Sequence, residues 1–543
     1  AFIGAQVLDS ESLAAGFERG FDVYDSDFHQ RAPGEDRYKT IERRAEDVAN
    51  RAMGWLSRHQ QGPFFIWMHF YDPHEPYDPP EPFKSHFAAE PYDGEIAYTD
   101  SVIGSVLEVL QRHGFYYSCV IAVAADHGEA FGEHGEQHHG MFLYDETIHV
   151  PFLLKLPGER LAGKRVDERV ALAAMAPTLL EVAGVAAPAT MQTRSLLALA
   201  ETPKNDEKGA KKRLEEQPIY SETNYNHRTF GWAVLRSWRE GKYLYVEAPK
   251  PELYDQTSDP GANHNIAATS QATADTLQAQ LESFWKKNSA GDATPPTLNQ
   301  SQEATLRALG YLPGSNSNKA RELAAVDPKD KVQVGAKFHH ALTSKDEDRY
   351  DDAIADLEDV IRMDPDLGAA YLELGGVYGI RNQYDLALPM LRKAAEIMPD
   401  SGSAHFQLGL VLVRMRQWDA ALPEMRAAVA CTPQSFLFHL DLASVLTQQK
   451  KISEAKDEYE KALAIKPEDF EANFIYGQLL LREGLADAAL RRLALAAKSN
   501  PESADAHSFL AQAYEKLGRT VDANEEREKA ARLKAQPSQQ APQ

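Results

Sequence analysis

A 34-residue period governs the C-terminal part of the chain, from residue 334 to residue 537. The prolines that recur at this step are Pro365, Pro399, Pro433, Pro467 and Pro501. Two further ladders hold only small residues: Ala353, Ala387, Ala421, Ala455, Ala489 and Ala523 in one, and Ala341, Gly375, Gly409, Ala443, Gly477 and Ala511 in the other. Small side chains let two helices approach closely, and a proline ends a helix because it lacks an N–H group. We therefore expect an all-α solenoid with one helix pair per repeat.

This pattern resembles the tetratricopeptide (TPR) repeat, in about six copies. The first copy is degenerate, because Lys331 stands where the preceding proline is expected, and residues 538–543 form a polar tail. A helical bundle without repeats is the alternative, and three ladders in one register argue against it. The resemblance implies a protein-interaction module whose concave face binds a protein or peptide partner.

Charge and composition exclude several classes of protein. The 543 residues include 58 basic and 81 acidic side chains, so the net charge is −23. A nucleic-acid partner is not expected, because phosphate-binding surfaces need clustered Lys and Arg. No apolar run reaches the about 18 residues that a membrane span needs. The two cysteines, Cys119 and Cys431, are too far apart in sequence to indicate a disulfide framework or a thiolate metal cage.

Residues 1–287 alternate between strand-like and helix-like patterns, which is typical of an α/β domain. We expect strands at residues 64–70, 119–125 and 152–156, and helices at residues 96–112 and 171–183. The first strand, the first helix and the second strand would make a βαβ unit, with 119–125 as a buried parallel strand. Residues 232–238 and 243–247 predict a small C-terminal antiparallel part. A charged insert at 201–216 precedes this part, and residues 288–333 form a linker with one short helix at 303–310.

Histidine is concentrated between residues 69 and 149, which hold nine of the 18: His69, His74, His86, His113, His127, His134, His138, His139 and His149. Imidazole is the commonest metal ligand and titrates near neutral pH, so the concentration favours a functional site over a histidine-rich surface loop. His134-Gly-Glu-Gln-His138 does not match the His-Glu-x-x-His pattern of zinc proteases.

The positions of three residues sharpen this prediction. Asp126 and His127 end a predicted strand, where open α/β sheets place their ligands. His74 lies in a proline-rich turn after another strand, and glycines keep the segment after His127 a tight loop. We therefore expect His74, Asp126 and His127 to converge at one edge of the sheet, with His138 and His139 nearby.

Four segments carry a resemblance to the sulfatase family of the alkaline phosphatase superfamily: PFFIWMHFYDPHEPYDPPEPF, YDGEIAYTDSVIG, ADHGEAFGEHGEQHHGMFLYDETIHVP and LRALGYL. The match runs in order to about residue 312, and bacterial proteins combine such a domain with TPR repeats. The resemblance implies an α/β sulfatase-like fold and a sulfuric ester hydrolase. It also implies metal ligation by Asp126 and His127, and contact of His74 and His139 with the transferred group. His138 and Glu129 are accessory candidates.

The family's nucleophile and two further acidic metal ligands precede the point where this chain begins, so we expect an N-terminally truncated chain that is inactive by itself. Cys431-Thr-Pro-Gln-Ser lacks the Arg of the family's nucleophile segment and lies on the proline ladder, so Cys431 is interpreted as a packing residue. Cys119 lies in a predicted buried strand and behaves as a small apolar residue. Neither cysteine is expected to be the nucleophile.

The resemblance implies a divalent ion, with Ca²⁺ as the first expectation and Mn²⁺ or Zn²⁺ as alternatives because a histidine ligand permits them. Two other functions stay open. One is a phosphoethanolamine- or phosphoglycerol-type transferase or phosphodiesterase, acting on a phosphate ester; Asp-His-Gly and His139 favour it, and the loop lacks the Lys of many sulfatases. The other is a pseudoenzyme whose repeats form a scaffold. By resemblance, we expect a periplasmic or membrane-anchored location.

Overall fold

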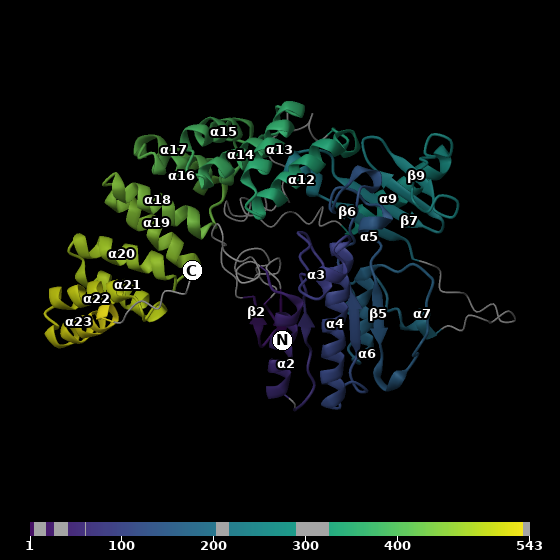
Figure 1. The fold of residues 1–543 in the computed structure, drawn as a ribbon, viewed down its shortest axis with the longest axis horizontal. Helices are drawn as coiled ribbons and strands as arrows, with labels where there is room; N and C mark the ends of the chain where they lie inside the picture. Colours follow the sequence, from purple (N-terminus) through teal and green to yellow (C-terminus); the bar gives the residue numbers. More distant parts are fainter. Residues whose placement is uncertain (5–17, 27–41, 60, 202–216, 289–324, 536–543) are drawn as a thin grey trace. The chain divides into compact units, whose positions relative to one another are not determined.

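The computed structural model describes residues 1–4, 18–26, 42–59, 61–201, 217–288 and 325–535 (Figure 1). Contacts between residues divide the chain into two compact units. The first comprises residues 1–291 with 322–360, and the second comprises residues 361–543 with 292–321. The helix predicted at 303–310 and residues 202–216 of the charged insert lie outside the described residues.

A small parallel sheet lies near the N-terminus of the first unit. Its order is β2-β1-β3, formed by β1 (Phe2–Ile3), β2 (Tyr24–Asp25) and β3 (Trp67–Met68). The helices that follow in the chain are α2 (Ala45–Arg58), α3 (Phe83–His86) and α4 (Pro91–Arg112). Apolar faces of α2 and α4 share one core, in which Leu56 and Val106 are buried. The strand expected at 64–70 is confirmed over two residues, and the helix expected at 96–112 begins earlier, at Pro91.

The strand predicted at residues 119–125 is present, but its burial and its pairing differ from the prediction. β4 (Ile121–Ala124) is half-buried and pairs antiparallel with β5 (Phe152–Lys155), so the predicted βαβ unit with a buried parallel strand is wrong. Cys119 precedes this strand rather than lying within it. A continuous apolar run indicates burial but carries no information on strand direction. The direction is set by the intervening segment, with η2 (Glu133–Gly135) and α5 (Asp145–Ile148), which returns the chain beside β4.

The rest of the first unit contains a four-stranded antiparallel sheet in the order β6-β7-β8-β9. Before it come η3 (Pro157–Glu159), η4 (Leu172–Ala174), α6 (Met175–Val182) and α7 (Leu197–Glu201). The sheet's elements are β6 (Ile219–Thr223), β7 (Leu235–Glu240), β8 (Tyr243–Glu247) and β9 (Glu252–Asp255), with α8 (Tyr225–Phe230) between the first two strands. Leu253 of this sheet packs against Leu277 and Leu281 of α9 (Gln271–Asn288). The predicted antiparallel part is confirmed, with its hairpin strand beginning at Leu235.

The 34-residue period appears as helix pairs after η5 (Pro328–Lys331). The helices are α12 (Val332–Asp346), α13 (Tyr350–Met363), α14 (Gly368–Ile380), α15 (Tyr384–Ile397), α16 (Gly402–Arg414), α17 (Trp418–Cys431), α18 (Phe436–Gln448), α19 (Ile452–Ile465), α20 (Phe470–Arg482), α21 (Ala486–Ser499), α22 (Ala504–Lys516) and α23 (Thr520–Ala535). A Cβ on Gly375 would lie 2.5 Å from Leu391 of the paired helix, which explains the small-residue ladder. Among the described residues, no helix has the length and apolar character that crossing a bilayer requires.

Candidate active site

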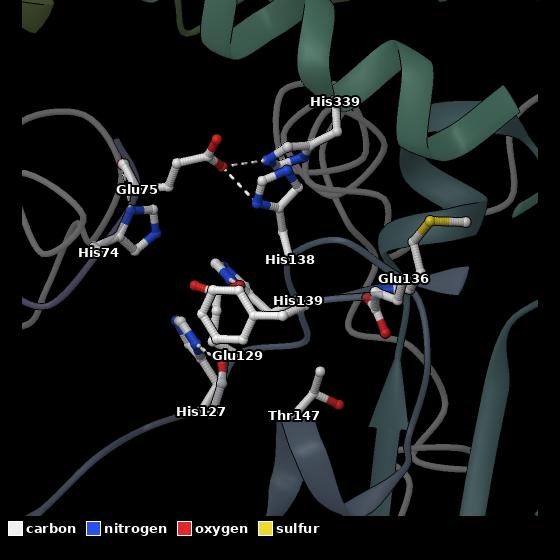
Figure 2. Close-up of polar contacts among 12 residues, drawn as sticks. His74, Glu75, His127, Glu129, Glu136, His138, His139, Thr147 and His339 are labelled. Carbon is white, nitrogen blue, oxygen red and sulfur yellow. Dashed lines mark hydrogen bonds and ion pairs between the residues drawn. The ribbon is translucent and has the colours of Figure 1, made fainter. Parts of the chain in front are cut away.

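Three histidines from separate segments of the first unit meet in one cluster (Figure 2). His74 follows β3, His127 follows β4, and His139 lies in the loop before α5. The rings of His127 and His139 stack with centroids 3.8 Å apart, and the His74 ring lies 5.2 Å from His139 and 6.0 Å from His127. One ring nitrogen of each lies within 4.8 Å of a ring nitrogen of the other two. The cluster can therefore surround one small group or ion.

The Nδ1 atom of each ring in this cluster is held by a fixed acceptor. His74 Nδ1 donates to the carbonyl oxygen of Glu75 at 2.8 Å, and His127 Nδ1 donates to that of Gly128 at 2.9 Å. His139 Nδ1 donates to Glu129 Oε1 at 3.2 Å. Because carbonyl and carboxylate oxygens can only accept, the proton of each neutral ring sits on Nδ1. Nε2 is then the atom of each ring that can bind a metal ion through its lone pair or, when the ring takes a second proton, donate to an ester oxygen.

Two buried carboxyl groups fix the backbone on either side of the cluster. Glu95 of α4 accepts from the His74 N–H at 3.1 Å and from the Asp78 N–H at 2.8 Å. Glu136 accepts from the Met141 N–H at 2.7 Å and holds the loop that carries His139. Burial raises the pKa of Glu95 to about 8 and that of Glu136 to about 7, although these backbone hydrogen bonds oppose the change. Both carboxyls therefore act as structural supports for the loops.

Gly128 sets the position of the segment after His127. Its N–H donates to the carbonyl oxygen of Thr147 at 2.8 Å, and a Cβ there would lie 2.3 Å from the carbonyl oxygen of Glu146. Only glycine lets the backbone approach α5 this closely. Gly140, directly after His139, has a φ of +100°, which a residue with a side chain rarely adopts. The glycines of this segment therefore allow the close packing that the predicted tight loop needs.

The pKa values of two cluster histidines are shifted in opposite directions. Burial lowers the pKa of His74 to about 4, and the neighbouring His139 and His127 add to the effect. Burial also acts to lower the pKa of His139, but the hydrogen bond and charge of Glu129 outweigh it and the pKa rises. The two rings thus differ in how readily they hold a second proton.

Asp126 lies at the open side of the cluster. Its side chain is 73% exposed, and Oδ1 lies 3.8 Å from His127 Nε2. These two neighbouring residues offer one carboxylate oxygen and one imidazole nitrogen, which are donors that a divalent ion accepts. The predicted convergence is thus present for His74, His127 and His139, with Glu129 supporting His139 and Asp126 adjoining His127.

His138 does not join the cluster, although it is adjacent to His139. Its Nδ1 lies 2.6 Å from Glu75 Oε2, and its ring stacks at 3.9 Å on His339 of α12 (Figure 2). His134 also has other partners, since its Nδ1 lies 2.6 Å from Glu146 Oε1. The accessory residue Glu129 therefore contacts the cluster directly, while His138 belongs to a second group.

The cysteines lack the environment of a nucleophile. Burial raises the pKa of the Cys119 thiol, and burial together with Asp400 raises that of Cys431. A raised pKa disfavours the thiolate, which is the reactive form. Cys431 ends α17, as the repeat register predicts.

Sequence reasoning missed four residues around the cluster: Glu75, Glu95, Glu136 and His339. Glu95 had a recognisable signal, because it shares a helical face with Val102 and Val106 at steps of seven and eleven residues. A carboxylate on an apolar face is expected to have a specific partner. For Glu136, within a glycine-rich loop, no periodic pattern was available.

Family models account for both halves of the chain. The model described as Sulfatase matches residues 7–185, and the one described as N-sulphoglucosamine sulphohydrolase, C-terminal, matches residues 132–289. Two tetratricopeptide models match residues 341–403, 406–470 and 446–513. The chain joins a sulfatase-family domain to TPR repeats. Both resemblances noted in the sequence are confirmed, as is the α/β domain followed by an all-α solenoid.

Relatives of the sulfatase domain are distant. Arylsulfatase K of Bos taurus and of Homo sapiens are each 32% identical over 199 residues, covering 36% of this chain and 36% of the relative. A delta 4,5-hexuronate-2-O-sulfatase of Bacteroides thetaiotaomicron is 30% identical over 194 residues, covering 34% of this chain and 39% of the relative. The aligned part of the chain thus spans between a third and two fifths of the length of these relatives.

Two solved structures are each similar to part of the chain. The structure of yidJ from Bacteroides fragilis is 22% identical, covers 46% of this chain and 60% of its own, and has a TM-score of 0.38. YrrB, a TPR protein with an unusual peptide-binding site, is 23% identical, covers 34% of this chain and 93% of its own, and has a TM-score of 0.31.

Proposed function

We propose that the sulfatase-family domain is the ester-binding part of a metal-dependent sulfuric ester hydrolase. The observation that carries the proposal is the convergence of His74, His127 and His139, each with Nδ1 held by a fixed acceptor. Such a group can hold one tetrahedral anionic group, because a ring protonated on both nitrogens donates from Nε2 and a neutral ring reaches the group through a bound ion. Family membership supports a sulfate ester as the substrate.

We assign separate roles to these residues. His74 and His139 contact the transferred group, and His139 is positioned by Glu129 to donate a proton to the leaving ester oxygen. Asp126 and His127 are the ligands that would hold a divalent ion, which when bound polarises the ester oxygens. Ca²⁺ is the first ion to test because a carboxylate oxygen suits it, and Mn²⁺ and Zn²⁺ follow because imidazole suits them.

Binding of substrate analogues by the full chain tests the function. With millimolar Ca²⁺, Mn²⁺ or Zn²⁺, calorimetric titration should detect an aryl sulfate, and His139→Gln should weaken binding at least tenfold. The exposed His149→Gln is the matched control and should bind as the wild type does. A consistent preference for an aryl phosphate would instead support the transferase or phosphodiesterase, for which His139 is the favouring residue. Binding of neither ester would leave the pseudoenzyme scaffold.

We also infer that this chain by itself turns over neither ester. Two ligands, Asp126 and His127, bind an ion only weakly by themselves. Neither cysteine thiol has the lowered pKa of an activated nucleophile. A colorimetric assay with aryl sulfate and aryl phosphate under each metal checks this, and metal-dependent turnover would contradict it.

The repeats are proposed to bind a peptide or protein partner, as helix-pair arrays commonly do. An extracytoplasmic location rests on the family resemblance, and fractionation of producing cells would test it.

A further inference from the structure

A second group of side chains lies beside the histidine cluster and has no role in the proposed reaction. It consists of Glu75, His138 and His339, whose ligand atoms all lie within 4.8 Å of one another. Glu75 and His138 are the chain neighbours of His74 and His139 but point the other way, toward α12 (Figure 2). Oε2 of Glu75 lies 2.6 Å from His138 Nδ1 and 3.1 Å from His339 Nε2. All three residues belong to the first unit.

His339 does not serve the internal packing of the repeats. The position that links the two helices of a repeat holds Lys337 in the first copy, which pairs with Asp356 at 3.1 Å. The equivalent residues 68, 102 and 170 positions later are His405, His439 and His507, which pair with glutamates of the following helix. His339 lies two residues after this position in the register. Its side chain contacts Glu75 and His138. Its neighbour His340 instead pairs with Asp356.

Hydrogen bonding alone leaves one atom of the group unsatisfied. His138 Nδ1 is buried and makes no hydrogen bond of acceptable direction, even though Glu75 Oε2 is 2.6 Å away. A buried polar atom of this kind usually has a partner, and an ion is one of the partners that can supply it. The side chains are 15% to 28% exposed, so the group is sheltered but open to a small solute.

The donor set matches that of a transition-metal site. Two imidazoles and one carboxylate are the protein ligands of many zinc sites that keep a fourth position for water. Ligand distances of about 2.0–2.2 Å in a tetrahedral site place the donor atoms about 3.3 Å apart. The present separations of 2.6 Å and 3.1 Å need to widen by less than about 1 Å, which rotation of the exposed end of one side chain can supply.

We propose that Glu75, His138 and His339 bind a second divalent transition ion of the Zn²⁺ class, separate from the ion held by Asp126 and His127. Such an ion would join α12 to both loops that carry the catalytic histidines, because one ligand adjoins His74 and another adjoins His139. The first helix of the repeats would thereby stabilise the geometry of the histidine cluster. The inference does not depend on the nature of the ester.

The test is Zn²⁺ binding by the metal-stripped full chain, measured by equilibrium dialysis with elemental analysis. We expect His339→Gln to lower the Zn²⁺ stoichiometry by one, or the affinity at least tenfold. His340→Gln, on the same helix, should bind as the wild type does. His127→Gln should still bind the Zn²⁺ ion that His339→Gln loses, which separates the second site from the ion of the proposed reaction. Bound Co²⁺ should show the visible bands of a four- or five-coordinate nitrogen and oxygen site, and lose them in His339→Gln.

Circular dichroism should show that His339→Gln is folded, and Glu75→Gln is the second variant if it is not. Equal Zn²⁺ binding by the wild type and both variants would overturn the proposal. Loss of all binding in His127→Gln would also overturn it, because the only ion would then belong to the catalytic cluster. Absence of Zn²⁺ binding by the wild type would reduce the group to a metal-free hydrogen-bonded contact.

Discussion

The two halves of the molecule use the same pair of side chains, imidazole and carboxylate, in different ways. In the repeats, His405, His439 and His507 each pair through Nδ1 with a glutamate 19 residues later. Their Nε2 atoms each contact a proline carbonyl oxygen six residues earlier, at 2.9–3.0 Å. Both ring nitrogens therefore have fixed structural partners. In the sulfatase-family domain, Nδ1 of each cluster histidine has such a partner, and among the described residues its Nε2 makes no hydrogen bond.

This difference shows that the number of occupied ring nitrogens, rather than the histidine itself, separates a structural role from a chemical one. In one of the repeats that lack the histidine, Asn473 takes its place and donates to the carbonyl oxygen of Pro467 at 2.9 Å. A structural histidine can thus be replaced by another donor. A histidine that acts through Nε2 cannot be replaced so simply.

The largest expected effect is on the stability of the repeats. His439→Ala should lower the free energy of unfolding by about 2–4 kcal/mol, because loss of the 4% exposed side chain removes the donor to the Pro433 carbonyl and leaves Glu458 with its ion pair to Lys461 alone. His439→Asn should recover part of the loss, since Asn473 makes the equivalent bond to a proline carbonyl. Urea denaturation measures both. Equal losses for Ala and Asn would show that the proline contact contributes nothing.

Gly128→Ala should disturb the site rather than the repeats. Its Cβ would lie 2.3 Å from the Glu146 carbonyl oxygen, a backbone atom that cannot move freely, so we expect a loss of about 2 kcal/mol. Gly104→Ala is the control in the same unit. A Cβ at Gly104, within α4, meets nothing within 4 Å, so this change should stabilise by up to about 1 kcal/mol. If both substitutions changed the free energy of unfolding in the same direction, the close approach at Gly128 would be contradicted.

The buried Glu95 should make the first unit depend on pH. Its pKa is raised to about 8 in the folded state, so the folded chain binds the proton more tightly than the unfolded chain does. The resulting stabilisation is complete below about pH 4.5 and is lost as the pH rises through about 8. From pH 6 to pH 8 the wild type should lose about 2 kcal/mol relative to Glu95→Gln. Urea denaturation of the wild type and of Glu95→Gln at the two pH values checks this. An equal change in the free energy of unfolding of both proteins would contradict it.

The smallest effect on stability should come from the cluster itself. His127→Gln should change the free energy of unfolding by less than about 1 kcal/mol, because its 35% exposed side chain makes only local contacts, with Gly128 and Asp126. Its binding of an aryl sulfate in the presence of a divalent ion should fall about tenfold, which corresponds to about 1.4 kcal/mol. A large loss of stability with unchanged binding would place His127 with the structural histidines.

The sequence predicted those features that rest on a period or a motif. The 34-residue ladder located the helix pairs, and the motif around Asp126 and His74 located the cluster. It did not predict the direction of β4, because an apolar run carries no directional signal. It did not separate His138 from His139 either, since which of two adjacent side chains faces the cluster depends on backbone angles set by Gly140 and Glu136. The role of His339 depends on packing between segments 264 residues apart.

Long-range ¹H–¹⁵N correlation spectra of the histidine rings test the central claim most directly. The account predicts that His74, His127 and His139 carry a proton on Nδ1, and that adding a divalent ion with an aryl sulfate shifts their Nε2 signals. The signals of His405, His439 and His507 should stay unchanged. Neutral cluster rings that carry their proton on Nε2 in place of Nδ1, or shifts confined to the repeat histidines, would contradict the assignment of His74, His127 and His139 as the ester-binding site.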